Sequence, residues 1–356
     1  MSPLSASYPA QRGFSLVEIM VAMVISLLGM IVIFQVFSIS EAQKRTTTGG
    51  SDAQTSGNIA LFGIEREMRM AGYGFASTTL LNCSIQAYDS QRTPPGDFNF
   101  RLVPVEITQG AAGAPDTVSI FYSASAKVID SRPFTKTTST NANYKVTNSQ
   151  RDGYAANDLV VAVGSGGINA CVLGQVTNIP GTPGNTDVIT ATPGQGRYNK
   201  AGGIDGPTGG TLYNLGTLPR NTQFSIQNAD RLVVQDNINY VDANGDGIND
   251  TLQLAEGIIN LQAQYGADIN DDGFVAPAEF SDAAPADSVI WGRLRAVRIA
   301  VLARSGQFEK TAVTPVAPSW TAGTFTMTNL ADGTDWRNYR YRVYETVVPL
   351  RNMIWR

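Results

Sequence analysis

The strongest pattern in this chain is a long apolar run near the N-terminus. Residues 14–37, FSLVEIMVAMVISLLGMIVIFQVF, contain a single charged residue, whereas residues 1–13, MSPLSASYPAQRG, are polar. At 1.5 Å per residue this run forms a helix of about 36 Å, enough to cross a hydrocarbon core of about 30 Å. An ordinary signal peptide has a shorter apolar region, followed by its cleavage site. The pattern therefore predicts a membrane-spanning helix, and the basic Arg12 before it places its N-terminus in the cytoplasm.

A second helical pattern follows, over residues 38–74. The first part is polar and compatible with a helix, and apolar residues then recur at helical spacing, as at Leu61 and Ile64. Gly49 and Gly50 lie between the two parts. Because glycine is a poor helix former, we expect an interruption there, either a point where the helix melts on assembly or a plain kink. Residues 38–74 are thus predicted to be an extracytoplasmic continuation of the first helix, which glycines near residue 72 bring to an end.

Residues 75–356 show the short apolar runs and frequent turn residues of a β-rich head. Strands are predicted at residues 101–108, 117–122, 158–163, 257–265, 293–304 and 339–348. In the fourth of these, the alternation predicts one shared face for Ile259, Leu261, Ala263 and Tyr265. The glycines and prolines of residues 181–210 predict a long surface loop. The predicted fold class is α+β: a long N-terminal helix, transmembrane in its first half, packed on a large antiparallel β-rich head.

Charge and composition narrow the class of function. The chain has 356 residues and a net charge of −4, and without residues 1–13 it would carry 25 basic and 30 acidic residues. This balance gives no support for nucleic-acid binding, which needs a basic surface. The chain contains no histidine, which removes Ser-His-Asp and Cys-His catalysis and the commonest zinc ligand. We expect no catalytic residues and no enzymatic activity.

Two cysteines, Cys83 and Cys171, allow only one intramolecular disulfide. The membrane-spanning prediction places both residues outside the cytoplasm, where disulfides form and persist. We therefore expect the pair to be bonded. The alternative is two unrelated buried thiols.

Glu18 is the single charged residue within the apolar run. A carboxylate inside a spanning helix costs about 2.5 to 3.5 kcal/mol on insertion scales, so it needs a partner. Glu18 is the fifth residue counted from Phe14. If the chain were cut after Gly13, Phe14 would carry a free amine, and Glu18 of one subunit would be able to pair with the amine of a neighbour. The alternative is a glutamate that snorkels to the membrane edge.

An acidic loop at residues 268–279 matches the pattern D-x-[DN]-x-[DN]-G-x5-E, which is that of calcium-binding loops. The matching residues are Asp268, Asn270, Asp272, Gly273 and Glu279. Oxygens at the first, third and fifth positions of such a loop converge on one cation, and the glycine permits a sharp turn. The Phe274 carbonyl would supply the next ligand, and Glu279 would close the shell with two oxygens. Pro277 fits the first residue of a short exiting helix.

A second acidic loop at residues 242–253 has the same opening. Its candidate calcium ligands are Asp242, Asn244, Asp246, Ile248 through its carbonyl, and Asp250. The twelfth position is Gln253, for which Asp250 at the ninth position would compensate, so this is the weaker site. Asp-Asn-Gly clusters also form simple turns, which is the alternative for both loops. Mutual repulsion between the carboxylates favours a bound cation, and we expect calcium.

The N-terminal string resembles a known processing signal. Arg12, Gly13, Phe14 and Glu18, followed by the apolar run, resemble the class III signal of prepilins over residues 10–37. The resemblance implies cleavage between Gly13 and Phe14 by a prepilin peptidase, N-methylation of Phe14, and assembly through Glu18.

Four downstream segments resemble the PilW-type minor pilins, which are similar to the J-type minor pseudopilins of type II secretion. They are REMRMAGYG at residues 66–74, QYGAD at residues 264–268, AVRI at residues 296–299 and PLRN at residues 349–352. The resemblance implies a subunit of a type IV pilus, held in the bacterial inner membrane by one helix, with a head that faces the periplasm before assembly. It also implies a priming complex at the pilus tip. The implied partners are other minor pilins, the major pilin, the prepilin peptidase and the assembly platform.

Two other functions remain open from the sequence. The first is a minor pseudopilin of a type II secretion system. The second, of a different class, is a calcium-dependent tip adhesin whose head binds a surface. A membrane-anchored periplasmic enzyme is disfavoured, because the sequence shows no nucleophile motif and no paired acids outside the two acidic loops.

Overall fold

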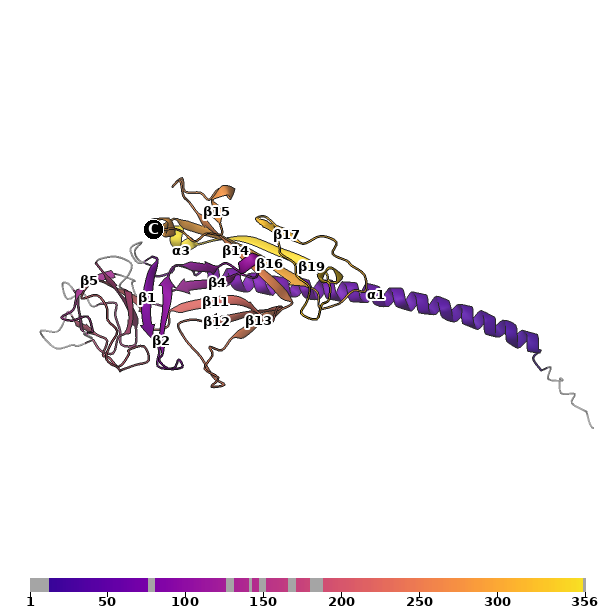
Figure 1. The fold of residues 1–356 in the computed structure, drawn as a ribbon, viewed down its shortest axis with the longest axis horizontal. Helices are drawn as coiled ribbons and strands as arrows, with labels where there is room; N and C mark the ends of the chain where they lie inside the picture. The colour runs from indigo at the N-terminus through magenta and orange to yellow at the C-terminus, as the bar shows by residue number, and fades with distance from the viewer. Residues whose placement is uncertain are drawn as a thin grey trace, which may run out of the picture. The chain divides into compact units, whose positions relative to one another are not determined.

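The computed structural model describes residues 13–75, 81–125, 131–140, 143–146, 152–165, 171–179 and 188–354. The chain divides into two compact units, Met1–Ser51 and Asp52–Arg356. It is an α+β protein in which a long N-terminal helix, apolar in its first part, is followed by a large antiparallel β-rich head, as the sequence predicts (Figure 1). Of the leader expected at residues 1–13, only Gly13 lies within the described residues.

The first unit consists of the N-terminal part of α1 (Leu16–Met68). This helix continues through Gly49 and Gly50 without a break, whereas melting of the helix on assembly stays a prediction. A glycine costs a helix roughly 1 kcal/mol relative to alanine. That cost does not end a helix that has already formed on both sides, because each further residue adds a backbone hydrogen bond.

The described strands of the second unit form three sheets and a small hairpin. Sheet A contains, in spatial order, β2 (Asp97–Leu102), β1 (Cys83–Tyr88), β8 (Cys171–Gln175), β7 (Leu159–Gly164), β10 (Gly209–Gly216), β5 (Ser131–Thr135), β6 (Asn143–Val146) and β9 (Val188–Thr190). Sheet B contains β13 (Leu252–Glu256), β12 (Arg231–Asp236), β11 (Arg220–Gln227), β4 (Thr117–Tyr122) and β3 (Val105–Thr108). Sheet C contains β15 (Phe280–Ser281), β14 (Ile258–Ala267), β16 (Leu294–Arg304) and β19 (Tyr341–Pro349). The hairpin is β17 (Ser319–Trp320) and β18 (Gly323–Thr324), and the short helices are η2 (Ala111–Gly113), η4 (Pro277–Glu279), α2 (Ser288–Gly292), η5 (Trp336–Asn338) and α3 (Arg351–Ile354).

Most of sheet A is an insertion between two strands that pair directly. β4 and β11 are antiparallel neighbours in sheet B, yet residues 123–219 separate them in sequence. Strands β5 to β10 all lie in that segment. One face of sheet A contributes to the main core, and the other encloses a second apolar cluster that includes Phe134, Tyr144 and Leu212. The inserted strands therefore have a small core of their own.

The helix end that belongs to the second unit packs through a face of small and apolar residues. Ala53, Ala60 and Ile64 are at most 3% exposed. A side chain at Gly57 would overlap the ring of Tyr344 on β19, and one at Gly63 would press on Leu254 on β13. The helix thus comes close to sheet B on one side and to sheet C on the other (Figure 1).

Strand β14 departs from the predicted alternation at one residue. Leu261, Ala263 and Tyr265 are buried in the main core as expected, but Ile259 belongs to a separate cluster on the other face of sheet C. The pairing of β14 with β16 shifts register between Ile258 and Asn260, which turns Ile259 outward and Ile258 inward. A β-bulge of this kind inserts one extra residue, and binary alternation does not reveal it.

Two other local predictions are corrected. The strand predicted at residues 101–108 is two strands, because Pro104 lies between β2 and β3 and has no backbone N–H to donate to a ladder. The region 181–210, predicted to be a surface loop, contains β9 and the start of β10, and its Tyr198 and Asn199 are buried. Its residues 181–187 lie outside the described part of the chain.

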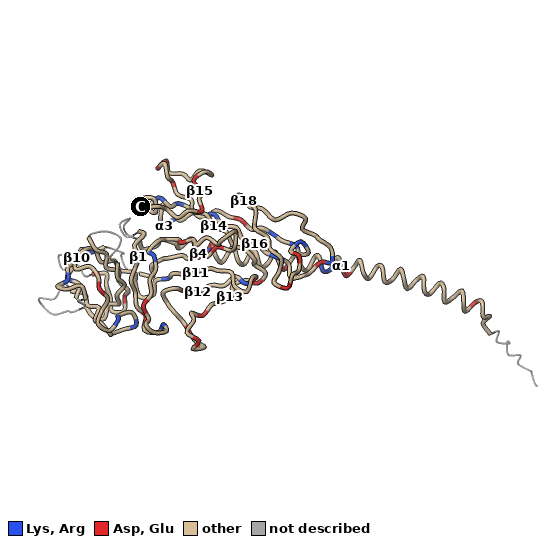
Figure 2. The backbone as a smooth tube through the Cα atoms, viewed as in Figure 1, with Lys and Arg blue, Asp and Glu red and all other residues tan. Residues whose placement is uncertain are grey.

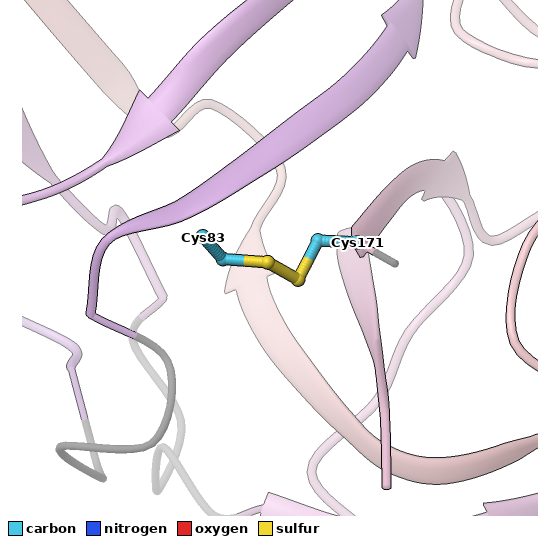
Figure 3. Close-up of a disulfide and its surroundings, with 2 residues drawn as sticks. All are labelled: Cys83 and Cys171. Atoms are coloured by element: carbon cyan, nitrogen blue, oxygen red, sulfur yellow. A yellow bond between two sulfur atoms is a disulfide. The ribbon is translucent and has the colours of Figure 1, made fainter. Parts of the chain in front are cut away.

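The predicted disulfide between Cys83 and Cys171 is confirmed (Figure 3). The two residues begin β1 and β8, which are parallel neighbours, and their Cα atoms are 6.3 Å apart. Both are buried. The bond ties the inserted part of sheet A to the strand that follows α1.

We predict that the double variant Cys83→Ala/Cys171→Ala is less stable by about 4 to 5 kcal/mol in the chain-entropy model, because the bond closes a loop between residues 88 positions apart. Urea unfolding of the purified full-length subunit measures the loss. Reduction of the native chain should shift its midpoint in the same direction and leave the double variant unchanged. Equal stability of the native and double-variant chains would contradict the prediction.

Candidate assembly segment and acidic loops

The residues expected to be processed lie just before α1 and are open to solvent. Phe14 is 79% exposed, and a side chain at Gly13 would meet nothing within 4 Å. Glu18 lies in the first turn of the helix, where its backbone N–H donates to the Ser15 carbonyl at 3.0 Å. A carboxylate in a first turn also interacts favourably with the positive end of the helix dipole. The Gly13–Phe14 bond is thus sterically accessible, and Glu18 lies within one turn of it.

The apolar side chains of this first unit are not buried by the rest of the chain. Every large apolar residue from position 14 to position 39 is between 51% and 79% exposed. Within the described residues, α1 is the one helix long and apolar enough to cross a membrane. An apolar helix of this length is unfavourable in water, because the free-energy cost of hydrating it rises with its exposed apolar area. The segment fits a membrane anchor.

The 268–279 loop is organised around one buried carboxylate. Asp268 is fully buried at the end of β14, and its Oδ1 and Oδ2 accept hydrogen bonds from the backbone N–H groups of Asp272 and Gly273 at 3.0 and 2.9 Å. Asp271 and Gly273 have φ values of 62° and 87°, the left-handed conformation that a sharp turn requires. Asn270 and Asp272 follow at alternate positions and hydrogen-bond to each other through their side chains. The turn predicted around Gly273 is present.

Glu279 closes this loop from its far end. Its Oε1 accepts a hydrogen bond from the backbone N–H of Ile269 at 3.1 Å, and its Oε2 accepts one from Ala276 at 2.8 Å. The residue lies in η4, which begins at Pro277 as the sequence predicts. Asp268 and Glu279, the first and last positions of the motif, thus both accept backbone N–H groups of this loop.

Arg293 holds the loop from outside, a role that the sequence analysis missed. Its guanidinium donates to the Ile269 carbonyl at 2.9 Å and to Asp271 Oδ2 at 3.0 Å. Its own carbonyl accepts from the Asp268 backbone N–H at 3.0 Å. The sequence did carry a signal, since Arg293 is the first basic residue after a stretch from position 232 that has none.

The 242–253 loop repeats the same hydrogen-bond pattern. Asp242 accepts from the backbone N–H groups of Asp246 and Gly247 at 3.1 and 2.9 Å, as Asp268 does in the first loop. Asp250 Oδ2 accepts from the N–H of Ala243 at 2.8 Å. That donor is the second residue of the motif, the position from which Glu279 accepts in the other loop. Asp250 therefore takes the closing place that the twelfth residue, Gln253, cannot fill.

The connections that carry the two loops, β12 to β13 and β14 to β15, are visibly acidic (Figure 2). Among the described residues, no three Asp, Glu or Cys side chains lie close enough together to hold a metal ion. The carboxylates accept backbone N–H groups instead. The candidate metal-ligand atoms are nonetheless all oxygens, at the positions that calcium-binding loops use. The residue types therefore fit calcium.

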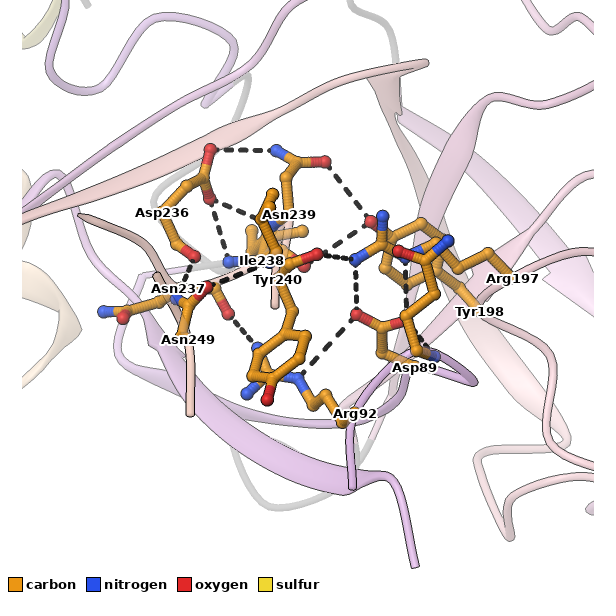
Figure 4. Close-up of polar contacts among 12 residues, drawn as sticks. Asp89, Arg92, Arg197, Tyr198, Asp236, Asn237, Ile238, Asn239, Tyr240 and Asn249 are labelled. Carbon is orange, nitrogen blue, oxygen red and sulfur yellow. Dashed lines mark hydrogen bonds and ion pairs between the residues drawn. The ribbon is translucent and has the colours of Figure 1, made fainter. Parts of the chain in front are cut away.

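A buried polar network holds the base of the 242–253 loop (Figure 4). Arg197 donates twice to the fully buried Asp89, both bonds at 2.7 Å, and once to the Tyr240 carbonyl at 2.7 Å. Arg92 donates to the Asn237 carbonyl. Hydrogen bonding to Asp89 raises the pKa of Arg197, whereas burial lowers the pKa of Arg92. The base of the loop is thus bound to the connection between β1 and β2 and to the inserted segment. No local signal in the sequence predicts this contact.

The C-terminal residues close the end of α1. Asn352 Nδ2 donates to the carbonyls of Arg69, Met70 and Ala71 at 3.4, 3.2 and 3.1 Å. The next residue, Met353, packs against Gly72. These carbonyls belong to the turn that directly follows α1, so Asn352 stabilises the chain where it leaves the helix. The structure therefore brings together the segments at residues 66–74 and 349–352, both of which the sequence analysis singled out.

Two family models match the chain. One, described as Type IV Pilus-assembly protein W, or PilW, matches residues 223–352, and the other, described as Prokaryotic N-terminal methylation motif, matches residues 8–34. Together the two matches support a type IV pilin-like minor pilin of the PilW type. A search of curated proteins and a search of solved structures each found no match.

The PilW match has clear structural boundaries in this pilin. It begins within β11 and ends at Asn352, so it covers sheet C, the β11–β13 part of sheet B, both acidic loops and the residue that closes α1. The inserted segment 123–219 lies outside both matches. The PilW framework and the inserted strands are therefore distinct parts of one head.

We predict that Asn352→Ala destabilises the pilin by roughly 1 to 3 kcal/mol, because its side chain donates to carbonyls of the turn that directly follows α1. Hydrogen exchange should rise first in residues 66–72. The control is Arg351→Ala, an exposed neighbour in the same helix α3. If both variants unfold at the same urea concentration as the native chain, Asn352 does not stabilise the helix end.

Proposed function

We propose that this pilin is incorporated into a type IV pilus and helps to initiate its assembly, as part of a priming complex at the tip. One observation carries the proposal: an accessible methylation segment and a spanning helix precede a PilW framework in the same chain. Before assembly the subunit would lie in the inner membrane with its head in the periplasm. Its partners would be other minor pilins, the major pilin, the prepilin peptidase and the assembly platform.

The proposed assembly step uses Gly13, Phe14 and Glu18. Peptidase cleavage after Gly13 would free the amine of Phe14, which is then N-methylated. Glu18 forms no ion pair with any other described residue, so its carboxylate remains available to a neighbouring subunit. In the low dielectric of a membrane or a filament core, an unpaired carboxylate is costly, and pairing with the amine of a neighbour removes that cost. The pair would set the axial position at which the subunit enters the filament.

Calcium would stabilise the head through the two acidic loops. In the first loop the ligands would be side-chain oxygens of Asp268, Asn270, Asp272 and Glu279, with the Phe274 carbonyl. In the second they would be Asp242, Asn244, Asp246, the Ile248 carbonyl and Asp250. A bound cation neutralises the clustered carboxylates and joins the two ends of each loop. The first loop connects β14 to sheet C's short β15 and leads on to β16, so ordering it would stabilise sheet C.

Two alternative functions also agree with specific observations. A minor pseudopilin of a type II secretion system would use the same processing segment and fold. A calcium-dependent tip adhesin is favoured by the inserted segment 123–219, which lies outside the PilW match and has its own apolar cluster. Pilin-family domains are structural rather than enzymatic, which agrees with a sequence that has no histidine.

We predict that Gly13→Val blocks processing, because a branched side chain then stands at the cleaved bond. The precursor should remain in the inner membrane, larger than the mature form by the residues of the leader. Gly29→Val, which places the same side chain in the apolar helix where it meets nothing, is the matched control. A mature-sized Gly13→Val product on a denaturing gel would exclude the leader.

We predict that a calcium chelator lowers the melting temperature of the full-length subunit. Calcium bound only to the folded state at a hundredfold excess over Kd contributes about 2.7 kcal/mol. Asp268→Ala and Glu279→Ala should abolish most of this response, and Asp242→Ala a smaller part. Glu256→Ala, an exposed acidic residue between the loops, is the control. Calorimetry that detects no binding at millimolar calcium, with an unchanged melting curve in chelator, would show that the loops are turns.

A further inference from the structure

A groove of about 680 Å³ lies in the second unit, away from both acidic loops. One wall is the loop that carries η2, residues 111–115, and a second is the turn between β11 and β12, residues 228–230. The third is the segment 326–332, which runs over the outer face of sheet C. Its volume falls within the range of about 300 to 1,000 Å³ that is usual for small-ligand sites.

The walls of the groove are held in place by contacts outside it. Asn260, which is 4% exposed, donates to the Gly113 carbonyl at 3.1 Å, and Gln262 donates to the Ala114 carbonyl at 2.9 Å. Gly113 in turn packs closely on Thr326 of the opposite wall. The groove is therefore formed before any ligand binds, which reduces the ordering cost of binding.

Backbone strain concentrates on this groove. Among the described residues other than glycine, six have a positive φ, and only two of these are alanines. Both alanines line the groove, Ala112 with φ 53° and Ala229 with φ 65°. Asparagine and aspartate tolerate this conformation, but alanine does so only when its surroundings impose it. Strain of this kind gathers at ligand sites, so its position here points to a function.

Three polar side chains that line the groove have unused hydrogen-bonding groups. Arg304 pairs with Asp230 at 3.5 Å, but its Nε is buried and has no hydrogen-bond partner among the described residues. The side-chain amides of Asn228 and Asn329 make no hydrogen bond within the described part of the chain. The two amides come from two different walls, and the guanidinium comes from β16. Together these side chains place hydrogen-bond donors and acceptors at several points around the groove.

We propose that this groove binds the end of a neutral oligosaccharide. Side-chain amides and a guanidinium hydrogen-bond well to neighbouring hydroxyl groups, which both donate and accept. Ile259 and Tyr341 give the groove apolar surface for the C–H faces of a sugar ring. Two carboxylates, Asp230 and Asp332, outweigh the single Arg304, which disfavours a phosphate or another anion. A bound peptide strand would pair its backbone with an open strand edge, whereas the free groups here are side chains on loops and turns.

The test is a glycan array of defined neutral oligosaccharides, probed with the full-length subunit in a detergent that has no sugar headgroup. Binding to any hit is then measured by calorimetry for Ala114→Trp and Ala331→Trp, which fill the groove from two walls. Both sites are exposed, so the variants should fold, and a thermal melt confirms this. Ala322→Trp, an exposed alanine in the β17–β18 turn outside the groove, is the matched control.

We expect the two groove variants to bind the saccharide at least tenfold more weakly, while Ala322→Trp binds as the native chain does. Arg304→Lys keeps the charge but removes Nε, and it should also weaken binding. An array without a hit overturns the proposal. So does a hit whose affinity survives both groove variants, or a groove that binds peptides and no saccharide.

Discussion

The head depends on the close approach of α1 to two sheets at once. Within the second unit, the helix presents Ala53, Ala60 and Ile64 to the core, and glycine at positions 57 and 63 lets side chains of sheets C and B reach the helix backbone. Any larger residue at Gly57 would meet the ring of Tyr344. The C-terminal residues then close the helix end through Asn352. Helix, sheets and C-terminus therefore stabilise one another, and the rest of the head is attached to this framework.

The inserted segment is attached to the framework by covalent and polar links. The disulfide joins β1 to β8, and the buried Asp89–Arg197 pair continues the connection to the Tyr240 carbonyl at the base of the 242–253 loop. Asp89 is fully buried, so loss of its guanidinium partner would be costly, because it would remove the charge that compensates a buried carboxylate. An insertion with its own apolar cluster is thus kept in a defined position relative to sheet B.

The two acidic loops show how backbone hydrogen bonds can organise carboxylates. In both, the first aspartate accepts N–H groups from the fifth and sixth positions, and the closing carboxylate accepts one from the second. Arg293 adds an opposite charge to the first loop but binds the fourth position, which is not a candidate ligand. In each loop the first and the closing carboxylates are thus positioned by backbone N–H groups of the loop itself.

The sequence alone determined the features whose physical cause is local. Hydrophobic length predicted the spanning helix, alternation predicted most of β14 and β16, and the spacing of Asp268 to Glu279 predicted a sharp turn at Gly273. Processing residues could be proposed because the signal is a contiguous string, which a family model for the N-terminal methylation motif also matches. The disulfide could be predicted because only two cysteines exist.

Features that join residues far apart in the chain could be seen only in the folded protein. The outward turn of Ile259 depends on a register shift against β16, and the position of Asn352 depends on where α1 ends. Arg197 and Asp89 are 108 residues apart, and no periodicity links them. The groove beside Arg304 has walls from three separate segments. Local propensity and spacing carry no information about such pairings, because they are selected by the summed packing of the whole core rather than by neighbouring residues.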